Sequence, residues 1–241
     1  MKVKTLSALA GVATAMILSS AANAAFTGIS FTSAPHAVLV GDPGGGGAQL
    51  ITTYQIFANF DNAGDTLTSV YGNPAATPGT PLSIEPRNAL DTGPGGSFFN
   101  NSFGGNSGPN AALFGVSPSL AWDTYVSIGF EPGDAGSDPT QFSPGFPAAL
   151  FTTGVTNQTN MSWFNPVITA GLNQGTHILI GQFSVAAGNN VRGTFGLTFR
   201  PSGATADTFV QNVTFNTLIP APGALALLGL AGVVGSRRRR A

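Results

Sequence analysis

The sequence predicts an all-β protein, an antiparallel β-sandwich of roughly eight strands. Several short stretches alternate apolar with polar residues, which is typical of strands that bury one face. Clusters of Gly, Pro, Asn and Asp separate these stretches, as expected for turns. Between the two terminal segments no stretch has a sustained period of 3.6 residues, so the helices that would cover a parallel sheet are not expected. A jelly-roll-like arrangement is the first expectation and an immunoglobulin-like arrangement the second.

In the first half of the chain the strongest strand pattern covers residues 48–60. Its apolar residues of one parity are Leu50, Tyr54, Ile56 and Phe60. Residues 66–71 are a weaker candidate, and residues 61–65 carry the Asp-Asn-Ala-Gly turn chemistry that predicts a hairpin between these two strands. Two further weak candidates precede them, at residues 26–31 and 36–40.

In the second half the clearest pattern covers residues 122–130, where Trp122 begins a mostly apolar face. Asp123 is expected on the opposite face, as a solvent-side or turn-capping carboxylate. Residues 188–190 predict a hairpin between the strands expected at residues 176–185 and 192–200, and a last strand is expected at 209–215. Two long Pro-containing loops are expected to be functional or loosely ordered: residues 72–120 and 132–160.

The composition favours a packed, secreted β protein without covalent staples. Charged residues make up 8% of the 241 residues, while there are 33 Gly, 17 Pro and 18 Phe. So many phenylalanines argue for a packed core rather than disorder. The absence of cysteine excludes disulfides, thiolate metal sites and cysteine nucleophiles.

The N-terminus has the three parts of a secretory signal peptide. Lys2 and Lys4 form the basic region, and residues 6–18 form an apolar region too short for a permanent membrane helix. A small-x-small cleavage motif follows, and we expect cleavage after its last residue: Ala22-Asn23-Ala24, with Ala25 as the first mature residue.

The C-terminus has a second three-part pattern. Pro220, Ala221, Pro222 and Gly223 form a helix-breaking motif within an uncharged stretch, residues 219–235. As a helix this stretch would span about 25 Å, at or just under the ~30 Å of a hydrocarbon core. The cluster that follows should remain on the cytoplasmic side, because guanidinium groups cross lipid at high cost: Arg237, Arg238, Arg239 and Arg240. We expect a transient membrane anchor rather than a folded element.

Removal of both terminal signals would leave an acidic body. Only Arg87, Arg192 and Arg200 remain as basic residues, against all ten acids, so the net charge is −7 with no lysine. Nucleic acids are recognised through Lys and Arg at phosphates, and nucleic-acid binding is therefore not expected.

This tail resembles the PEP-CTERM sorting signal of Gram-negative, exopolysaccharide-producing bacteria. In that family a Pro-Glu-Pro motif precedes an apolar helix and an Arg cluster; here Ala221 stands at the Glu position. The resemblance covers about 22 of 241 residues and implies processing by exosortase, an integral-membrane cysteine transpeptidase. It also implies delivery to the cell envelope, outer surface or extracellular matrix of a Gram-negative-type bacterium. The body looks like uncharacterised β-rich envelope proteins with such tails, mostly through residues 122–129.

Catalytic and metal-binding patterns are weak, and no enzyme, cofactor or metal is expected. His36 is expected to be exposed and His177 to be a packed or edge residue; no Gly-x-Ser-x-Gly or His-Glu-x-x-His motif accompanies them. A glycosidase pair such as Glu85 and Glu131 stays formally open. Two oxygen-rich turns could hold calcium, although ordinary turn chemistry is the preferred interpretation: residues 61–65 and 131–138. Gly44–Gly47 is expected to be a flexible loop rather than a phosphate loop.

The functional expectation is a non-enzymatic, exported structural or matrix-interacting protein. The alternative is a carbohydrate-binding module for exopolysaccharide, and a secreted hydrolase is the third class. Exposed loop aromatics would favour binding and buried ones a scaffold, the candidates being Trp163, Phe164, Phe98 and Phe99.

Overall fold

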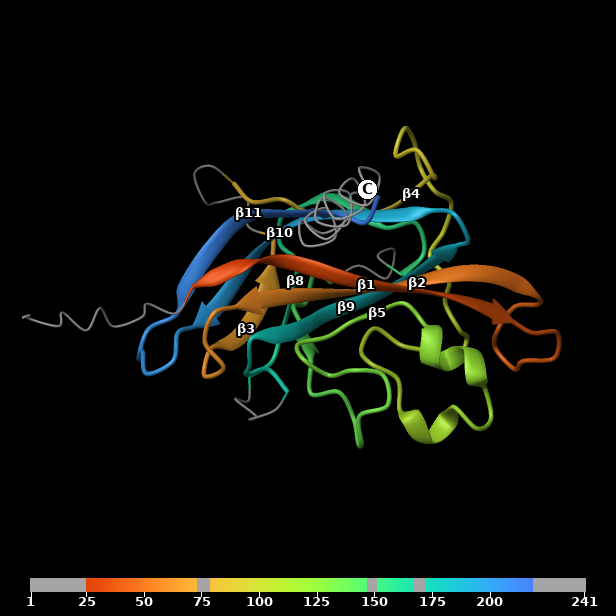
Figure 1. The fold of residues 1–241 in the computed structure, drawn as a ribbon, viewed down its shortest axis with the longest axis horizontal. Coiled ribbons are helices and arrows are strands. Elements are labelled where there is room, and N and C mark those ends of the chain that lie inside the picture. Colours follow the sequence, from red (N-terminus) through yellow and green to blue (C-terminus); the bar gives the residue numbers. More distant parts are fainter. Residues whose placement is uncertain (1–24, 73–78, 147–150, 167–171, 219–241) are drawn as a thin grey trace, which may run out of the picture.

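The computed structural model describes residues 25–72, 79–146, 151–166 and 172–218 (Figure 1). The expected signal peptide with Ala22 and Ala24, and the expected tail from Pro220 to the Arg cluster, lie outside them. The described residues form eleven strands and two 3-10 turns: β1 (Phe26–Val38), β2 (Gln49–Phe60), β3 (Thr66–Tyr71), β4 (Leu82–Arg87), η1 (Ala111–Leu113), η2 (Pro118–Trp122), β5 (Tyr125–Val126), β6 (Gln141–Phe142), β7 (Val155–Gln158), β8 (Ser162–Phe164), β9 (His177–Ala186), β10 (Asn190–Arg200) and β11 (Thr208–Asn216).

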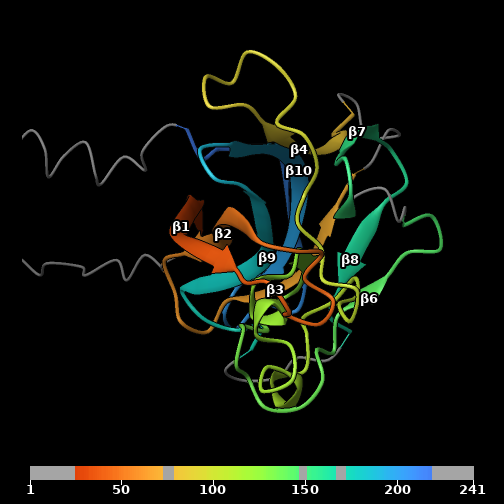
Figure 2. The same ribbon diagram turned by 90° about the vertical axis from the view of Figure 1, so that its right-hand side faces the viewer.

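Two antiparallel sheets pack face to face, as the all-β sandwich prediction requires. The four-stranded sheet has the order β1-β2-β9-β5, and the seven-stranded sheet has the order β6-β8-β3-β10-β4-β7 with β11 paired to β10. In Figures 1 and 2 the segment that carries η1 and η2 lies outside the four-stranded sheet, on the face turned away from β10 and β11. This segment is what encloses the candidate site.

The main core lies between the sheets. Ile56, Ile180 and Phe183 from one sheet meet Phe195 and Leu197 from the other. Every residue of β9 from Ile178 to Val185 is buried, because the outer loops cover the second face of that strand as well. A small second cluster on the outer face, formed by Phe57, Tyr125 and Leu179, packs under these loops.

Both predicted hairpins at residues 61–65 and 188–190 are wrong. β2 and β3 belong to different sheets, and so do β9 and β10, so each turn carries the chain from one sheet to the other. Asp, Asn and Gly favour a reversal of direction but do not decide whether the second strand pairs with the first or faces it across the core. The β10–β11 connection, in contrast, is a true hairpin.

The strand predicted at residues 122–130 is also wrong. Trp122 ends η2, and only Tyr125–Val126 forms a strand. Asp123, expected on the solvent side, is buried, whereas Trp122 is half-buried. Pro118 occupies the first turn of η2, where its missing N–H costs nothing. Residues 123–130 are all buried, since loops lie on one side of them and the sheet on the other, so alternation carries no information there.

Short strands are the other difference from the prediction. β4 lies within the expected loop 72–120, β6 and β7 lie within the expected loop 132–160, and β8 follows it. The two weak candidates near the N-terminus form one strand, β1, that runs through Pro35. A proline is tolerated there because β1 is the edge of its sheet, where a missing N–H leaves no ladder bond unmade.

Candidate functional site

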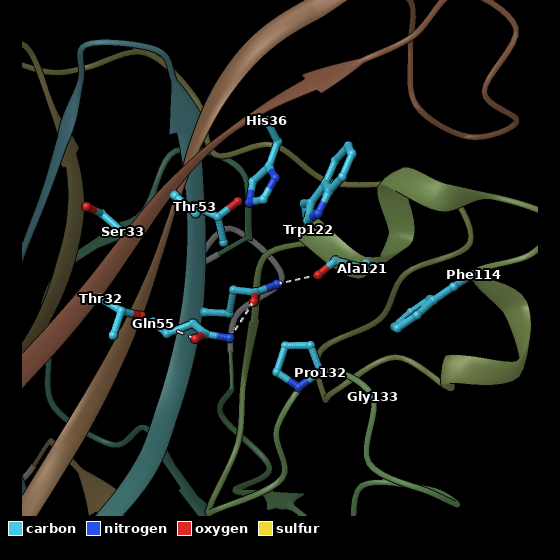
Figure 3. A pocket seen from close by; sticks show the side chains of 12 residues that line it. Thr32, Ser33, His36, Thr53, Gln55, Phe114, Ala121, Trp122, Pro132 and Gly133 are labelled. Atoms are coloured by element: carbon cyan, nitrogen blue, oxygen red, sulfur yellow. Dashed lines mark hydrogen bonds between the residues drawn. The ribbon is translucent and has the colours of Figure 1, made fainter.

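A groove of about 510 Å³ lies on the outer face of the four-stranded sheet, between the sheet and the η1–η2 loops (Figure 3). Its floor comes from β1, β2 and β9, and its walls come from η2 and the loops around it. The lining residues are Thr32, Ser33, Ala34, His36, Thr53, Gln55, Phe114, Ala121, Trp122, Pro132, Gly133 and Gln182.

A ladder of polar side chains crosses the floor. Strand register places Thr32 opposite Gln55 and Gln55 opposite Gln182. Thr32 Oγ1 donates to Gln55 Oε1 at 3.2 Å, and Gln55 Nε2 donates to Gln182 Oε1 at 3.3 Å. Gln182 is buried, and its Nε2 donates to the carbonyl oxygens of Ala121 and Asp123 at 3.0 and 2.9 Å. These bonds fix Gln182, so the more exposed Thr32 and Gln55 are held in one orientation (Figure 3).

An aromatic pair forms one wall of the groove. The His36 imidazole stacks on the Trp122 indole with ring centroids 4.4 Å apart and an interplanar angle of 12°. Trp122 also packs against the buried cluster of Val38, Ile51 and Phe99, and its carbonyl oxygen accepts from Ser184 Oγ at 2.5 Å. Burial lowers the pKa of His36 below its ordinary value, so the imidazole is uncharged at neutral pH. Phe114 and Pro132 stand across the groove from this pair (Figure 3).

The carboxylate of Asp123 lies beneath this wall. Its Oδ1 accepts from the Asn101 backbone N–H at 2.7 Å, and the side chain is 1% exposed. Burial raises the pKa of Asp123 to about 7, although backbone N–H groups of Asn101, Thr124 and Gly105 favour the charged form. Gly104 packs so closely that an added Cβ would lie 1.8 Å from Asp123 Oδ2. Asp123 therefore has a structural role, because it connects the loop at residues 101–105 to the segment that carries Trp122.

A second carboxylate, Asp42, holds the loop after β1 against η2. Asp42 Oδ1 accepts from Ser117 Oγ at 2.9 Å and Oδ2 accepts from the Ser119 N–H at 2.8 Å. Burial alone would raise the pKa of Asp42, but the hydrogen bonds from Ser119 and Ser117 outweigh it and lower the pKa below its usual value. Asn101 Nδ2 donates to the hydroxyl oxygens of Ser117 and Ser119, at 2.8 and 2.9 Å. Hydrogen bonds among Asp42, Asn101, Ser117 and Ser119 thus hold the groove wall in place.

The four aromatic residues named as candidates for a binding surface do not form an exposed cluster. Trp163 is fully buried, with Nε1 donating to Ser127 O and Ile180 O, both at 3.1 Å. Phe98 and Phe99 are buried, and Phe164 is partly buried in β8. These four positions therefore favour a scaffold. Gln55 and Gln182 were not predicted as site residues, and Trp122 was expected on the core side.

The histidines and candidate acids do not converge. His36 is half-buried rather than exposed, whereas His177 begins β9, is exposed and stacks on Phe57 with centroids 3.9 Å apart. Ser30 Oγ lies 3.2 Å from His177 Nε2 but donates its hydrogen to Asn59 Oδ1. Glu85 lies in β4 of the seven-stranded sheet, whereas Glu131 lies in a turn beside the groove on the other sheet.

In both oxygen-rich turns, carboxylate oxygens accept hydrogen bonds from backbone N–H groups. Asp61 Oδ1 accepts from Ala25 N at 2.7 Å, and Asp65 Oδ1 accepts from Ser202 N at 2.9 Å. In the second turn Asp134 Oδ2 accepts from Glu131 N at 2.8 Å, as turn carboxylates commonly do. Within the part of the chain that the structure describes, no group of three or more His, Asp or Glu side chains could hold a metal ion.

The arginines of the body lie away from the groove. Arg87 and Arg192 share Glu85 and Asp91 in an ion-pair network on β4, β10 and the loop between β4 and the groove wall. Arg200 pairs with Asp207 at 2.9 Å in the β10–β11 hairpin.

No family model matches this chain, and neither a curated protein sequence nor a solved structure matches it. The described residues define an all-β sandwich with a walled groove on one outer face. Among them there is no helix both long and apolar enough to span a bilayer, and the apolar residues 219–235 lie outside them.

Proposed function

We propose that this chain is an exported, non-enzymatic cell-envelope protein that binds polysaccharide in the groove beside Trp122. One observation carries the proposal: a rigid ladder of hydroxyl and amide groups runs next to a stacked aromatic pair. A pocket of this kind, largely apolar with a few precisely placed polar groups, is typical of a small-molecule or oligomer site. Its volume falls in the usual range for such sites, about 300–1,000 Å³.

The chemistry of the groove suits sugars. A pyranose presents an apolar C–H face and a rim of hydroxyls, so it needs an apolar wall together with groups that both donate and accept. Trp122 and Phe114 supply the wall, and the Gln55 amide and Thr32 hydroxyl supply both kinds of hydrogen-bonding partner. Because Gln182 already orients Gln55, little side-chain entropy is lost on binding.

The export part of the proposal rests on the two terminal signals. The basic and apolar N-terminal segment with cleavage before Ala25, and the PEP-CTERM-like tail with Pro220–Gly223 and the Arg cluster, support delivery by an exosortase-like transpeptidase. The membrane contact through residues 219–235 would be transient. For the finer topology of the sandwich we propose a jelly-roll-like relationship, with an immunoglobulin-like one as the alternative.

A glycan array probed with the purified full-length chain tests the binding function. We expect binding to at least one polysaccharide, weakened about tenfold or more by Trp122→Ala. Phe209→Ala is the matched control, because Phe209 is 67% exposed on β11 of the other sheet. Absence of binding to every glycan, or equal loss in both variants, would reject the groove and leave a structural scaffold.

A further inference from the structure

None of the described residues that line the groove has a charged side chain. Its titratable lining residue is His36, which is neutral at neutral pH because burial lowers its pKa. The remaining polar groups are hydroxyls and carboxamides, which hydrogen-bond to a sugar without a preference for ionic charge. A site built to hold uronates or sulfates would place Arg or Lys in reach of those anions.

The three arginines of the body form ion pairs away from the groove. Arg87 and Arg192 are held by Glu85 and Asp91, and Arg200 is held by Asp207. The three arginines lie on strands of the seven-stranded sheet. With the terminal signals removed the body carries −7 and no lysine. A polyanion would therefore approach a surface of its own sign and find no compensating group at the groove.

The apolar surface continues past Trp122. A second hollow of about 340 Å³ lies on the other side of this residue and is lined by Leu39, Val40 and Val116, each more than half exposed. Asp42 borders this hollow, but both of its carboxylate oxygens are taken by Ser117 and Ser119. Since Trp122 lines both hollows, a polymer that crosses it contacts both.

We infer that the groove takes an uncharged polysaccharide, bound across Trp122 by an internal stretch of the polymer rather than by one of its ends. This inference rests on the proposed function, and it names the ligand class and the mode of binding. Recognition then depends on hydroxyl hydrogen bonds and apolar contact, so affinity should be nearly independent of salt.

The experiment compares immobilised neutral polysaccharides (dextran, galactomannan) with acidic ones (alginate, hyaluronan), using the full-length chain. Binding is measured at about 20 mM and about 500 mM sodium chloride, which brackets strong and weak screening. We expect the neutral polymers to bind with a change in Kd below about twofold between the two salts, and the acidic polymers to bind at least about tenfold more weakly. Disaccharide fragments should compete far more weakly than the polymer, because they cannot occupy both hollows.

A charge-adding variant gives a gain of binding as a second readout. Thr32 is exposed on the groove floor, so Thr32→Arg should raise affinity for alginate and make it salt-dependent. Thr208→Arg adds the same charge at an exposed position of β11 and should change alginate binding much less.

The outcomes separate the two proposals. Tighter, salt-dependent binding of alginate than of dextran by the unaltered protein overturns the neutral ligand class and leaves polysaccharide binding intact. Equal effects of Thr32→Arg and Thr208→Arg, or competition by disaccharides as strong as that of the polymer, overturn the binding mode across this groove. Failure to bind any polysaccharide rejects the proposed function, and the ligand class with it.

Discussion

Replacement of Asp123 by Asn should remove a large pH dependence of stability. Burial raises the pKa of this carboxyl from 3.8 to about 7, a shift of about three units. Each unit corresponds to about 1.36 kcal/mol, so the folded state favours the protonated form by about 4 kcal/mol relative to the unfolded state. The amide of Asn cannot titrate, so this contribution is absent from Asp123→Asn.

The direction of the effect follows from which state holds the proton. Between pH 4 and pH 7 the folded protein keeps the Asp123 proton while the unfolded chain releases it. The stabilising contribution is therefore complete below about pH 4 and is lost as the pH rises to about 7. Relative to the unaltered protein, Asp123→Asn should gain about 2 kcal/mol of stability from pH 5 to pH 7.

Urea unfolding of both proteins at pH 5, 6, 7 and 8 measures this difference. With a denaturant slope of about 2 kcal/mol/M, the gap between the two midpoints should change by roughly 1 M from pH 5 to pH 7 and little above pH 7. The amide N–H of Asn near backbone donors can shift the stability of Asp123→Asn by a constant amount, but this shift does not change how stability varies with pH. The titration of His36 contributes equally to both proteins. Parallel midpoint curves would refute the account of Asp123 as a buried, proton-retaining carboxyl.

The remaining predictions concern the contact beneath the groove and the two chain ends. Gly104→Ala should lower the free energy of unfolding by about 1–3 kcal/mol, because the added Cβ would collide with Asp123. The control Gly105→Ala should be nearly neutral, because its added Cβ meets no atom within 4 Å. Equal effects of the two variants in urea unfolding would contradict this prediction. N-terminal sequencing of envelope protein should begin at Ala25, whose new ammonium would pair with Asp61, and recovery of Met1 would reject the cleavage. Neutral replacement of the terminal arginine cluster should let the chain pass the membrane unprocessed, as intact-mass analysis of cell fractions would show; retention of Ala241 in the unaltered mature protein would reject processing.

Local patterning was sufficient to predict the positions of β10 and β11. The alternation around Phe195, Leu197 and Phe199 predicted β10, and the alternation from Phe209 to Phe215 predicted β11, although Phe209 itself is exposed. Where loops cover the outer face as well, as over residues 123–130, inward and outward positions are both buried and alternation loses its meaning. Asp123 was wrongly expected to face solvent because these loops bury the outer positions as well.

The groove depends on pairing between distant parts of the chain, which local patterns do not encode. Thr32, Gln55 and Gln182 align only through the registers of β1 with β2 and of β2 with β9. A register shift between Ile56 and Phe57 changes which side chains of β9 face outward, and no turn residue marks it. The polar ladder is therefore a tertiary feature that no local pattern in the sequence indicates.

The repeated crossings between sheets bear on when the molecule can fold. Because the chain changes sheet after β2, β4, β5, β8 and β9, neither sheet is complete until residues near the C-terminus have been made. Folds dominated by such distant pairings form slowly. If the chain is exported as proposed, this delay keeps the growing polypeptide extended and competent for translocation. The expected C-terminal anchor, which follows β11, would then hold the chain at the membrane while the sandwich closes outside the cell.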